Sequence, residues 1–231
     1  MKKWMKLTLL AVLPVLFLTS CDDDDDASEM LTEEARVLVV HASPNAPGVD
    51  LYVDGTKANT SALNYPNNTG YLTLPAGSRN IKVTAAGAGM GSPVIDANVT
   101  LEKDKNYSVF AAGPLSGLTP VVLVDDLTAP ASGRAHVRFV HLSPDAPGVD
   151  VVVQGENNLF SDIEFKEGTA FTPVNAGSYT LEVQPVGTDV AAVTATLNLQ
   201  AGKIYTVYAQ GFLNPPSGNT NTLGAGVIMN N

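Results

Sequence analysis

Apolar and polar residues alternate with a period of two along many short stretches of this chain. Residues 49–54, 80–84 and 179–184 each place apolar side chains on one parity and polar side chains on the other; the last of these reads YTLEVQ. Successive side chains of a β-strand point to opposite faces of a sheet. The alternation therefore predicts strands with one buried face.

Turn-forming residues separate these stretches at intervals of about eight to twelve positions. They are Asp54-Gly55, Asn67-Asn68, Ala76-Gly77, Asp104-Lys105 and Gly113-Pro114. No stretch after residue 20 sustains the apolar period of a helix. The pattern predicts an all-β protein built from antiparallel, immunoglobulin-like β-sandwiches.

The same unit occurs twice. Residues 36–55 and 136–155 align without gaps, with 12 of the 20 positions identical, and the register continues through 74–83 and 174–183. It then slips by two, so that 101–113 matches 199–211. A slip of two residues fits a loop, because loops tolerate insertions. The duplication predicts two tandem domains, 36–127 and 135–231, joined by a linker at 128–134.

The first 20 residues read as a targeting signal. Three lysines precede an apolar run at 7–18, which is shorter than an ordinary membrane-spanning helix. Residues 18–21, LTSC, resemble a bacterial lipoprotein cleavage box. That resemblance implies cleavage before Cys21 and a lipid on its sulfur. The alternatives are an ordinary signal peptide, or a membrane anchor with a chance cysteine.

Five carboxylates follow the cysteine and are expected to stay extended in water, so residues 21–35 are predicted to be a disordered tether. They are Asp22, Asp23, Asp24, Asp25 and Asp26. The acidic run also resembles the surface-export signals of Bacteroidetes lipoproteins. It implies a lipid-anchored protein exposed on the bacterial outer membrane, with the periplasmic face as the alternative.

Charge narrows the range of partners. Without the three lysines of the leader, the chain has ten basic and 23 acidic residues, a net charge of −13. Nucleic-acid binding needs clustered Lys and Arg, so no nucleic-acid partner is expected. Contact with a membrane is expected through the lipid alone.

The repeated loop, Ser-Pro-Asn/Asp-Ala-Pro-Gly-Val-Asp, supplies the candidate site. Its candidate residues are His41, Asn45, Asp50, His141, Asp145 and Asp150. The prolines and glycine favour a stiff structural corner. In it the Asn or Asp would accept backbone N–H groups two residues on, and Asp50 and Asp150 would accept N–H groups of the loop. The alternative is a His–carboxylate pair, His41 with Asp50 and His141 with Asp150, that binds a cation or acts as acid and base.

Side-chain parity makes two further predictions. Arg138 should face water, which places His141 inward or at the rim of the sandwich. Tyr52 and Tyr208 should lie on outward faces, where they could stack against a glycan, although exposed tyrosines are also ordinary in strands.

Recognisable catalytic motifs do not occur in the sequence: it contains no Gly-x-Ser-x-Gly elbow, phosphate loop or paired-histidine zinc helix. Cys21 is the only cysteine, which excludes an intramolecular disulfide and a cysteine-based metal site. We therefore expect no enzymatic activity, metal or cofactor.

Four segments of the first unit together resemble the domain of unknown function family 4397. They are the opening motif, LPAG at 74–77, YSV at 107–109 and LVDDL at 123–127. The resemblance implies an exported bacterial protein with tandem copies of the fold. It implies no activity, and residues 222–229 of the second unit lack the Val-Asp-Asp sequence.

The expected function is that of a non-catalytic, lipid-anchored envelope protein for adhesion, ligand capture or envelope structure. An accessory module that binds a glycan or a peptide at the cell surface is the alternative. A metal-dependent enzyme at the duplicated His/Asp loop is the third possibility.

Overall fold

A computed structural model describes residues 33–231, and these form an all-β structure. Cys21 and the aspartates at 22–26 lie outside the described residues. The described part contains a single short 3₁₀ helix, Leu115–Gly117, and no helix that is long and apolar enough to cross a membrane.

Sixteen strands follow one another along residues 33–231. The first repeat contains β1 (Glu34–Ala42), β2 (Val49–Val53), β3 (Thr56–Lys57), β4 (Asn68–Pro75), β5 (Gly77–Ala85), β6 (Ile95–Leu101), β7 (Asn106–Ala112) and β8 (Thr119–Asp125). The second repeat contains β9 (Arg134–His141), β10 (Val149–Val153), β11 (Asn158–Ile163), β12 (Thr172–Asn175), β13 (Gly177–Pro185), β14 (Val193–Leu199), β15 (Ile204–Gln210) and β16 (Gly224–Met229).

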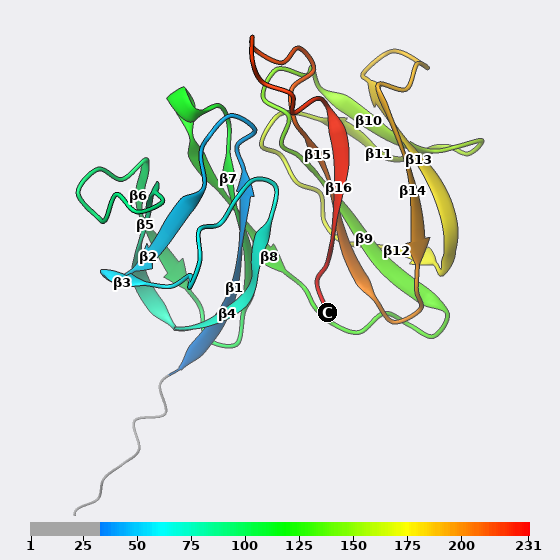
Figure 1. The fold of residues 1–231 in the computed structure, drawn as a ribbon. Helices are drawn as coiled ribbons and strands as arrows, with labels where there is room; N and C mark the ends of the chain where they lie inside the picture. Colours follow the sequence, from blue (N-terminus) through cyan, green and yellow to red (C-terminus); the bar gives the residue numbers. More distant parts are fainter. Residues whose placement is uncertain (1–32) are drawn as a thin grey trace, which may run out of the picture. The chain divides into compact units, whose positions relative to one another are not determined.

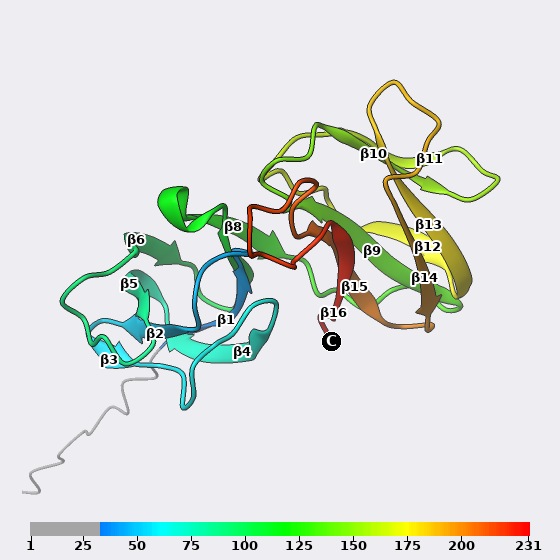
Figure 2. The same ribbon diagram turned by 45° about the horizontal axis from the view of Figure 1, so that its top comes forward.

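Each repeat consists of two four-stranded sheets with the same strand order. In the first repeat the orders are β4-β1-β7-β8 and β3-β2-β5-β6 (Figure 1). In the second repeat they are β12-β9-β15-β16 and β11-β10-β13-β14 (Figure 2). The duplication in sequence is therefore a duplication of topology.

The sheets are not wholly antiparallel, which corrects the sequence prediction. β1 pairs in parallel with β7, and β9 pairs in parallel with β15. Parallel neighbours need a long crossover connection. Here the connection runs through strands of the opposite sheet and through one edge strand of the same sheet, β4 or β12. A period-two pattern does not reveal this route.

Each repeat has its own hydrophobic core between its two sheets. In the first, Val37 and Val39 of β1 pack in one cluster with Leu51 of β2 and Ile81 of β5. In the second, the equivalent cluster includes Phe139. The predicted alternation is confirmed by β13, whose Leu181 and Val183 are buried in the core.

A third hydrophobic cluster joins the repeats. It contains Leu38 and Phe110 of the first repeat and Val140 and Tyr208 of the second. β1 and β9 are therefore covered on both faces, one by their own core and the other by the opposite repeat. This explains why β1 reads as a nearly continuous apolar run rather than as an alternation.

Two parity predictions fail because the first repeat covers this face of the second. Arg138 lies on the face of β9 opposite Phe139, as expected, but that face is covered and Arg138 is 1% exposed. Tyr208 is likewise 4% exposed, so it offers no outward surface for stacking. Tyr52 remains half-buried on β2.

Candidate functional site

The repeated loop forms two equivalent corners, one in each repeat. The first corner (residues 41–50) leads from β1 into β2, and the second corner (residues 141–150) leads from β9 into β10. His41 is the penultimate residue of β1 and His141 is the last residue of β9, and they are 1% and 0% exposed. Of the two placements predicted for His141, inward or at the rim of the sandwich, its burial shows the inward one.

The histidine rings brace the corners through backbone hydrogen bonds. Nε2 of His41 donates to the carbonyl of Pro47 at 2.9 Å, and Nδ1 accepts the N–H of Ser43 at 3.4 Å. In the second corner, His141 makes the same bonds to Pro147, at 2.9 Å, and to Ser143, at 3.3 Å. A carbonyl only accepts, so these bonds assign the neutral tautomer with its proton on Nε2.

Burial lowers the pKa of both histidines from 6.5, and the bonds to the proline carbonyls oppose that shift. Each ring also meets an aromatic ring edge-on. His41 lies 6.1 Å from Tyr65, and His141 lies 6.2 Å from Phe165, measured between ring centroids. The serine hydroxyls of the corners are equally enclosed, since Ser43 and Ser143 are 0% exposed and out of reach of a substrate.

Asn45 and Asp145 connect the corners to a distant loop, not to the residues two positions on as predicted. The Asn45 side chain accepts the backbone N–H of Leu115 at 2.8 Å, after β7. Asp145 accepts two N–H groups after β15, those of Leu213 and Asn214, each at 2.7 Å. Leu115 and Leu213 are corresponding positions of the two repeats, so the contact is duplicated with the loop.

Asp50 and Asp150 do not bond to the histidines in the described structure. Asp50 accepts the N–H of Gly87 at 3.0 Å and pairs with Lys57 at 2.8 Å. The Gly87 bond, followed by Lys57, lowers the pKa of Asp50 below its usual value. Asp150 accepts the N–H of Asp162 at 2.8 Å. Both do accept backbone N–H groups, as predicted, but from other strands and hairpins rather than from the corner itself.

The corner glycines leave room for side chains from the next loop. A β-carbon on Gly148 would lie 2.5 Å from a carboxylate oxygen of Glu164, and on Gly48 it would meet the amide of Asn64. The corners are therefore tightly packed, and their histidine, Asn45 and Asp145 side chains are engaged by backbone, whereas the buried hydroxyls of Ser43 and Ser143 have no hydrogen-bond partner among the described residues. Within residues 33–231, no group of three or more His, Cys, Asp or Glu side chains is placed to hold a metal ion.

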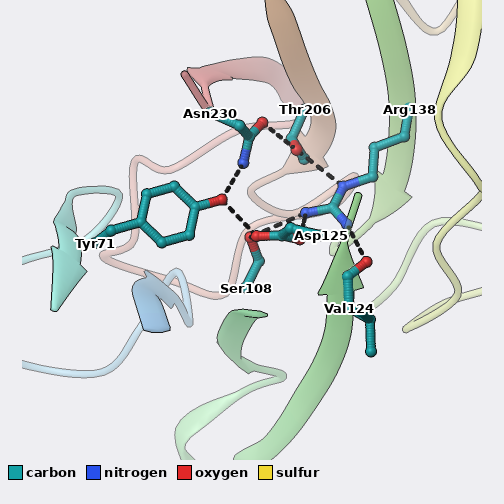
Figure 3. A network of polar contacts seen from close by, with 7 residues as sticks. All are labelled: Tyr71, Ser108, Val124, Asp125, Arg138, Thr206 and Asn230. Atoms are coloured by element: carbon teal, nitrogen blue, oxygen red, sulfur yellow. Dashed lines mark hydrogen bonds and ion pairs between the residues drawn. The ribbon is translucent and has the colours of Figure 1, made fainter. Parts of the chain in front are cut away.

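A second polar cluster, which the sequence analysis missed, lies between the repeats (Figure 3). We call it the inter-repeat network; its members are Tyr71, Ser108, Val124, Asp125, Arg138, Thr206 and Asn230. At its centre Arg138 of β9 pairs with Asp125 of β8 at 2.6 Å. The two side chains are 2% and 0% exposed.

Other members of the network supply hydrogen-bond partners to the two charged side chains of the buried ion pair. The Arg138 guanidinium also donates to Ser108 and to Thr206, both at 2.9 Å, and it stacks on the ring of Phe171 at 4.4 Å. Asp125 accepts the hydroxyls of Tyr71 and Ser108 at 2.5 and 2.7 Å. A buried charge is tolerated only with such partners.

Asn230 extends the network on the side of the second repeat. It accepts the hydroxyl of Thr206 at 2.8 Å and donates to Tyr71 at 3.1 Å (Figure 3). Burial, then the nearby charge of Asp125, raises the pKa of Tyr71, so this phenol stays protonated. Because its central ion pair is buried, the network fastens one repeat to the other. The only sequence signal for it was an arginine at 138 where the first repeat has Leu38.

Of several hollows on the surface of residues 33–231, one lies between β3 and β4 of the first repeat and is large enough for a small ligand. It has a volume of about 380 Å³ and is lined by residues 58–64 and 67–69 together with Leu72. Its wall combines amide and hydroxyl groups, including those of Asn64, Asn67 and Ser61, with alanine and leucine side chains, and no charged residue lines it. Part of this wall is already engaged, since the Asn59 amide bonds the backbone of β2. No pattern in the sequence indicates this hollow.

Several solved structures match the chain, including two of low similarity from Bacteroides species. One is a leucine-rich repeat protein from Bacteroides thetaiotaomicron, 12% identical, with a TM-score of 0.20 over 75% of this chain and 26% of that one. The chain thus spans about a quarter of that protein. The other is described as a "putative cell adhesion protein" from Bacteroides eggerthii, 8% identical, with a TM-score of 0.20 over 85% and 95% of the two chains. Scores this low carry no argument about fold or function.

No curated protein matches the chain. The profile of one protein family does, and it covers most of the described residues in two copies, 35–152 and 135–224. The resemblance drawn from the repeated motif is thereby confirmed: the chain belongs to the family described as Domain of unknown function (DUF4397).

Proposed function

We propose that this protein is a non-catalytic, lipid-anchored module of the bacterial cell envelope, serving adhesion, ligand capture or envelope structure. The observation that carries the proposal is the state of the duplicated corners. Their histidine, asparagine and aspartate side chains, which were the candidates for chemistry, are occupied by hydrogen bonds to backbone groups in both repeats. The histidine bonds are the same in the two corners, whereas Asp50 and Asp150 accept N–H groups from different segments. Such groups make a stiff scaffold rather than a reactive centre.

The proposed architecture is a pair of immunoglobulin-like domains, residues 36–127 and 135–231, held at the outer membrane by a lipid on Cys21. The lipobox-like residues and the acidic run support this placement, with exposure at the cell surface favoured over the periplasmic face. The net charge of −13 after the leader would repel anionic headgroups, so the lipid would provide the attachment.

The test combines fractionation with surface proteolysis. Cys21→Ser should move the protein from the membrane to the soluble fraction, whereas Ser20→Ala, the matched control, should leave it membrane-bound. Replacing the five aspartates at 22–26 by asparagine should keep the anchor but protect the protein from protease added to intact cells. Membrane retention of Cys21→Ser would refute the anchor, and unchanged protease sensitivity would refute the export role of the aspartates.

The surface hollow favours a second candidate function, the binding of a glycan. Its amide and hydroxyl lining has no charged residue, which suits a neutral, hydroxyl-rich ligand. A glycan array probed with the leader-free protein tests this function. Binding that is lost in Asn67→Ala and kept in Asn157→Ala, a matched change on the exposed turn of the second repeat, would support it. A blank array would count against it.

A further inference from the structure

The two repeats meet through corresponding faces. By the alignment of the repeats, Phe110 corresponds to Tyr208, and these two rings contact each other across the interface, with centroids 6.3 Å apart. In a two-fold interface each patch meets its own counterpart, and residues on the axis touch their equivalents. The interface inside this chain therefore has the form of a homodimer interface.

The inter-repeat network breaks that symmetry at every position. Arg138 corresponds to Leu38, and Thr206 corresponds to Ser108. Asp125 of β8 pairs with Asn106 of β7. The equivalent position of the second repeat, beside Ile204 of β15, is occupied by Asn230, so Asp125 corresponds to Asn230. Tyr71 corresponds to Phe171. The cation is thus confined to the second repeat and its carboxylate to the first.

We propose that these differences make the face of each repeat specific for the other repeat and reject a second copy of itself. The partner that each face fits is the complementary half, from the same chain or from another copy of this chain. The proposal concerns pairing alone and does not depend on the function proposed above.

Each self-pairing leaves a buried charge without its counter-ion. Two first repeats would place Asp125 opposite Leu38, so that a carboxylate with 0% exposure would lack a cation. Two second repeats would place Arg138 opposite Asn230, which is neutral. Breaking a buried pair is strongly unfavourable, whereas a pairing with both charges satisfies them.

A steric difference acts in the same direction. Leu123 of β8 packs across the interface on Gly168, where a β-carbon would lie only 2.6 Å from the nearest leucine methyl. The corresponding position of the first repeat is Asn68, since Val40 pairs with Asn68 as Val140 pairs with Gly168. A pairing of two first repeats would press Leu123 against an asparagine side chain.

The experiment cuts the folded chain between its repeats. β8 ends at Asp125 and β9 begins at Arg134, and most of the residues between them are exposed, so a protease recognition sequence inserted there would be accessible. After cleavage of the full protein, native mass spectrometry and size exclusion should show one first half bound to one second half. Dissociated halves, or pairs of identical halves, would overturn the proposal.

Mixing labelled and unlabelled cleaved protein tests the pairing of the halves without substituting any residue of the interface. Cleaved protein is mixed with cleaved protein uniformly labelled with ¹⁵N and left to equilibrate. Hybrid pairs of a labelled and an unlabelled half should form, each with one first and one second half. Pairs of two first or two second halves above about 1% would contradict the pairing rule.

Variants then test whether the charges of Arg138 and Asp125 determine which halves pair. In the cleaved protein, Arg138→Leu should weaken association by at least about 100-fold. Arg134→Leu is the matched control, because Arg134 bonds Asn175 within its own repeat, and it should leave association unchanged. Arg138→Leu with Asp125→Asn removes both charges and should restore pairing while admitting pairs of two second halves. Unchanged association in Arg138→Leu, or strict hetero-pairing in the double variant, would refute the role of the charges.

Discussion

Acid should destabilise this protein through its two corner histidines. The folded-state pKa of His41 and of His141 lies below the unfolded value of 6.5, because the rings are buried. Between the two pKa values the unfolded chain binds more protons than the folded chain, so stability rises with pH there. The stabilisation is complete above about pH 6.5 and is lost as the pH falls through the folded-state pKa.

The magnitude follows from linkage. One proton per site changes the free energy of unfolding by at most about 1.4 kcal/mol per pH unit, so two sites give at most about 2.7 kcal/mol per unit. We expect a loss of about 1–3 kcal/mol between pH 7.5 and 5. Protonation also removes the acceptor at Nδ1, which leaves the N–H groups of Ser43 and Ser143 without their partner.

The aspartates whose pKa values are lowered by the fold do not titrate between pH 7.5 and 5. Asp50, Asp54, Asp96 and Asp126 have pKa values held below 3.8 by hydrogen bonds from backbone and side-chain donors and by nearby cations. Their contributions are present above about pH 4 and are lost only below it. The window from pH 7.5 to 5 therefore isolates histidine.

Urea unfolding at a series of pH values, followed by circular dichroism, measures the effect. The double variant His41→Gln/His141→Gln should be less stable at pH 7.5 and should lose the slope between pH 6.5 and 5. His136→Gln, a matched change at the histidine outside both corners, should keep the slope. A free energy of unfolding that is flat from pH 7.5 to 5 in the native protein would refute the structural role assigned to the two rings.

Three further changes test the packing. Arg138→Leu should cost about 3–5 kcal/mol in urea unfolding by leaving Asp125 buried and unpaired, and adding Asp125→Asn should recover most of that loss; an effect below about 1 kcal/mol would contradict the buried ion pair. Asp145→Ala should cost about 1–2 kcal/mol by removing two backbone hydrogen bonds at an exposed site, and Asp145→Asn should cost less because it keeps an acceptor, so equal losses would argue against the corner contact. Gly226→Ala should lower the free energy of unfolding by about 1–3 kcal/mol, measured by thermal unfolding, because its β-carbon would overlap the Tyr208 ring. Gly224→Ala, two residues earlier on the same strand, should be tolerated.

The rigidity of the molecule bears on its proposed role. Each repeat keeps its own core, and a third cluster with a buried ion pair joins the two. Domains joined by small polar interfaces move by default, whereas a buried apolar interface opposes such motion. We therefore expect the two repeats to present the corners and the surface hollow in a fixed relation.

The strands, the duplication and the stiff corners could be predicted from the sequence because their causes are local. Alternation with a period of two placed Leu181 and Val183 in a core, and Asp54-Gly55 forms the predicted turn with both residues at positive φ, 47° and 81°. The identity of the candidate corner residues was also local information, since prolines and glycine at fixed spacing limit the backbone whatever surrounds it.

Only the tertiary structure decided what these residues contact. Alternation tells which side chains share a face but not what covers that face, so Arg138 was expected in water and lies instead against the other repeat. The partner of Asn45 is 70 residues away, and the parallel pairing of β1 with β7 depends on how the whole chain crosses between sheets. Local sequence fixes the conformation of a segment, while its long-range partners follow from the topology and from the packing of one repeat on the other.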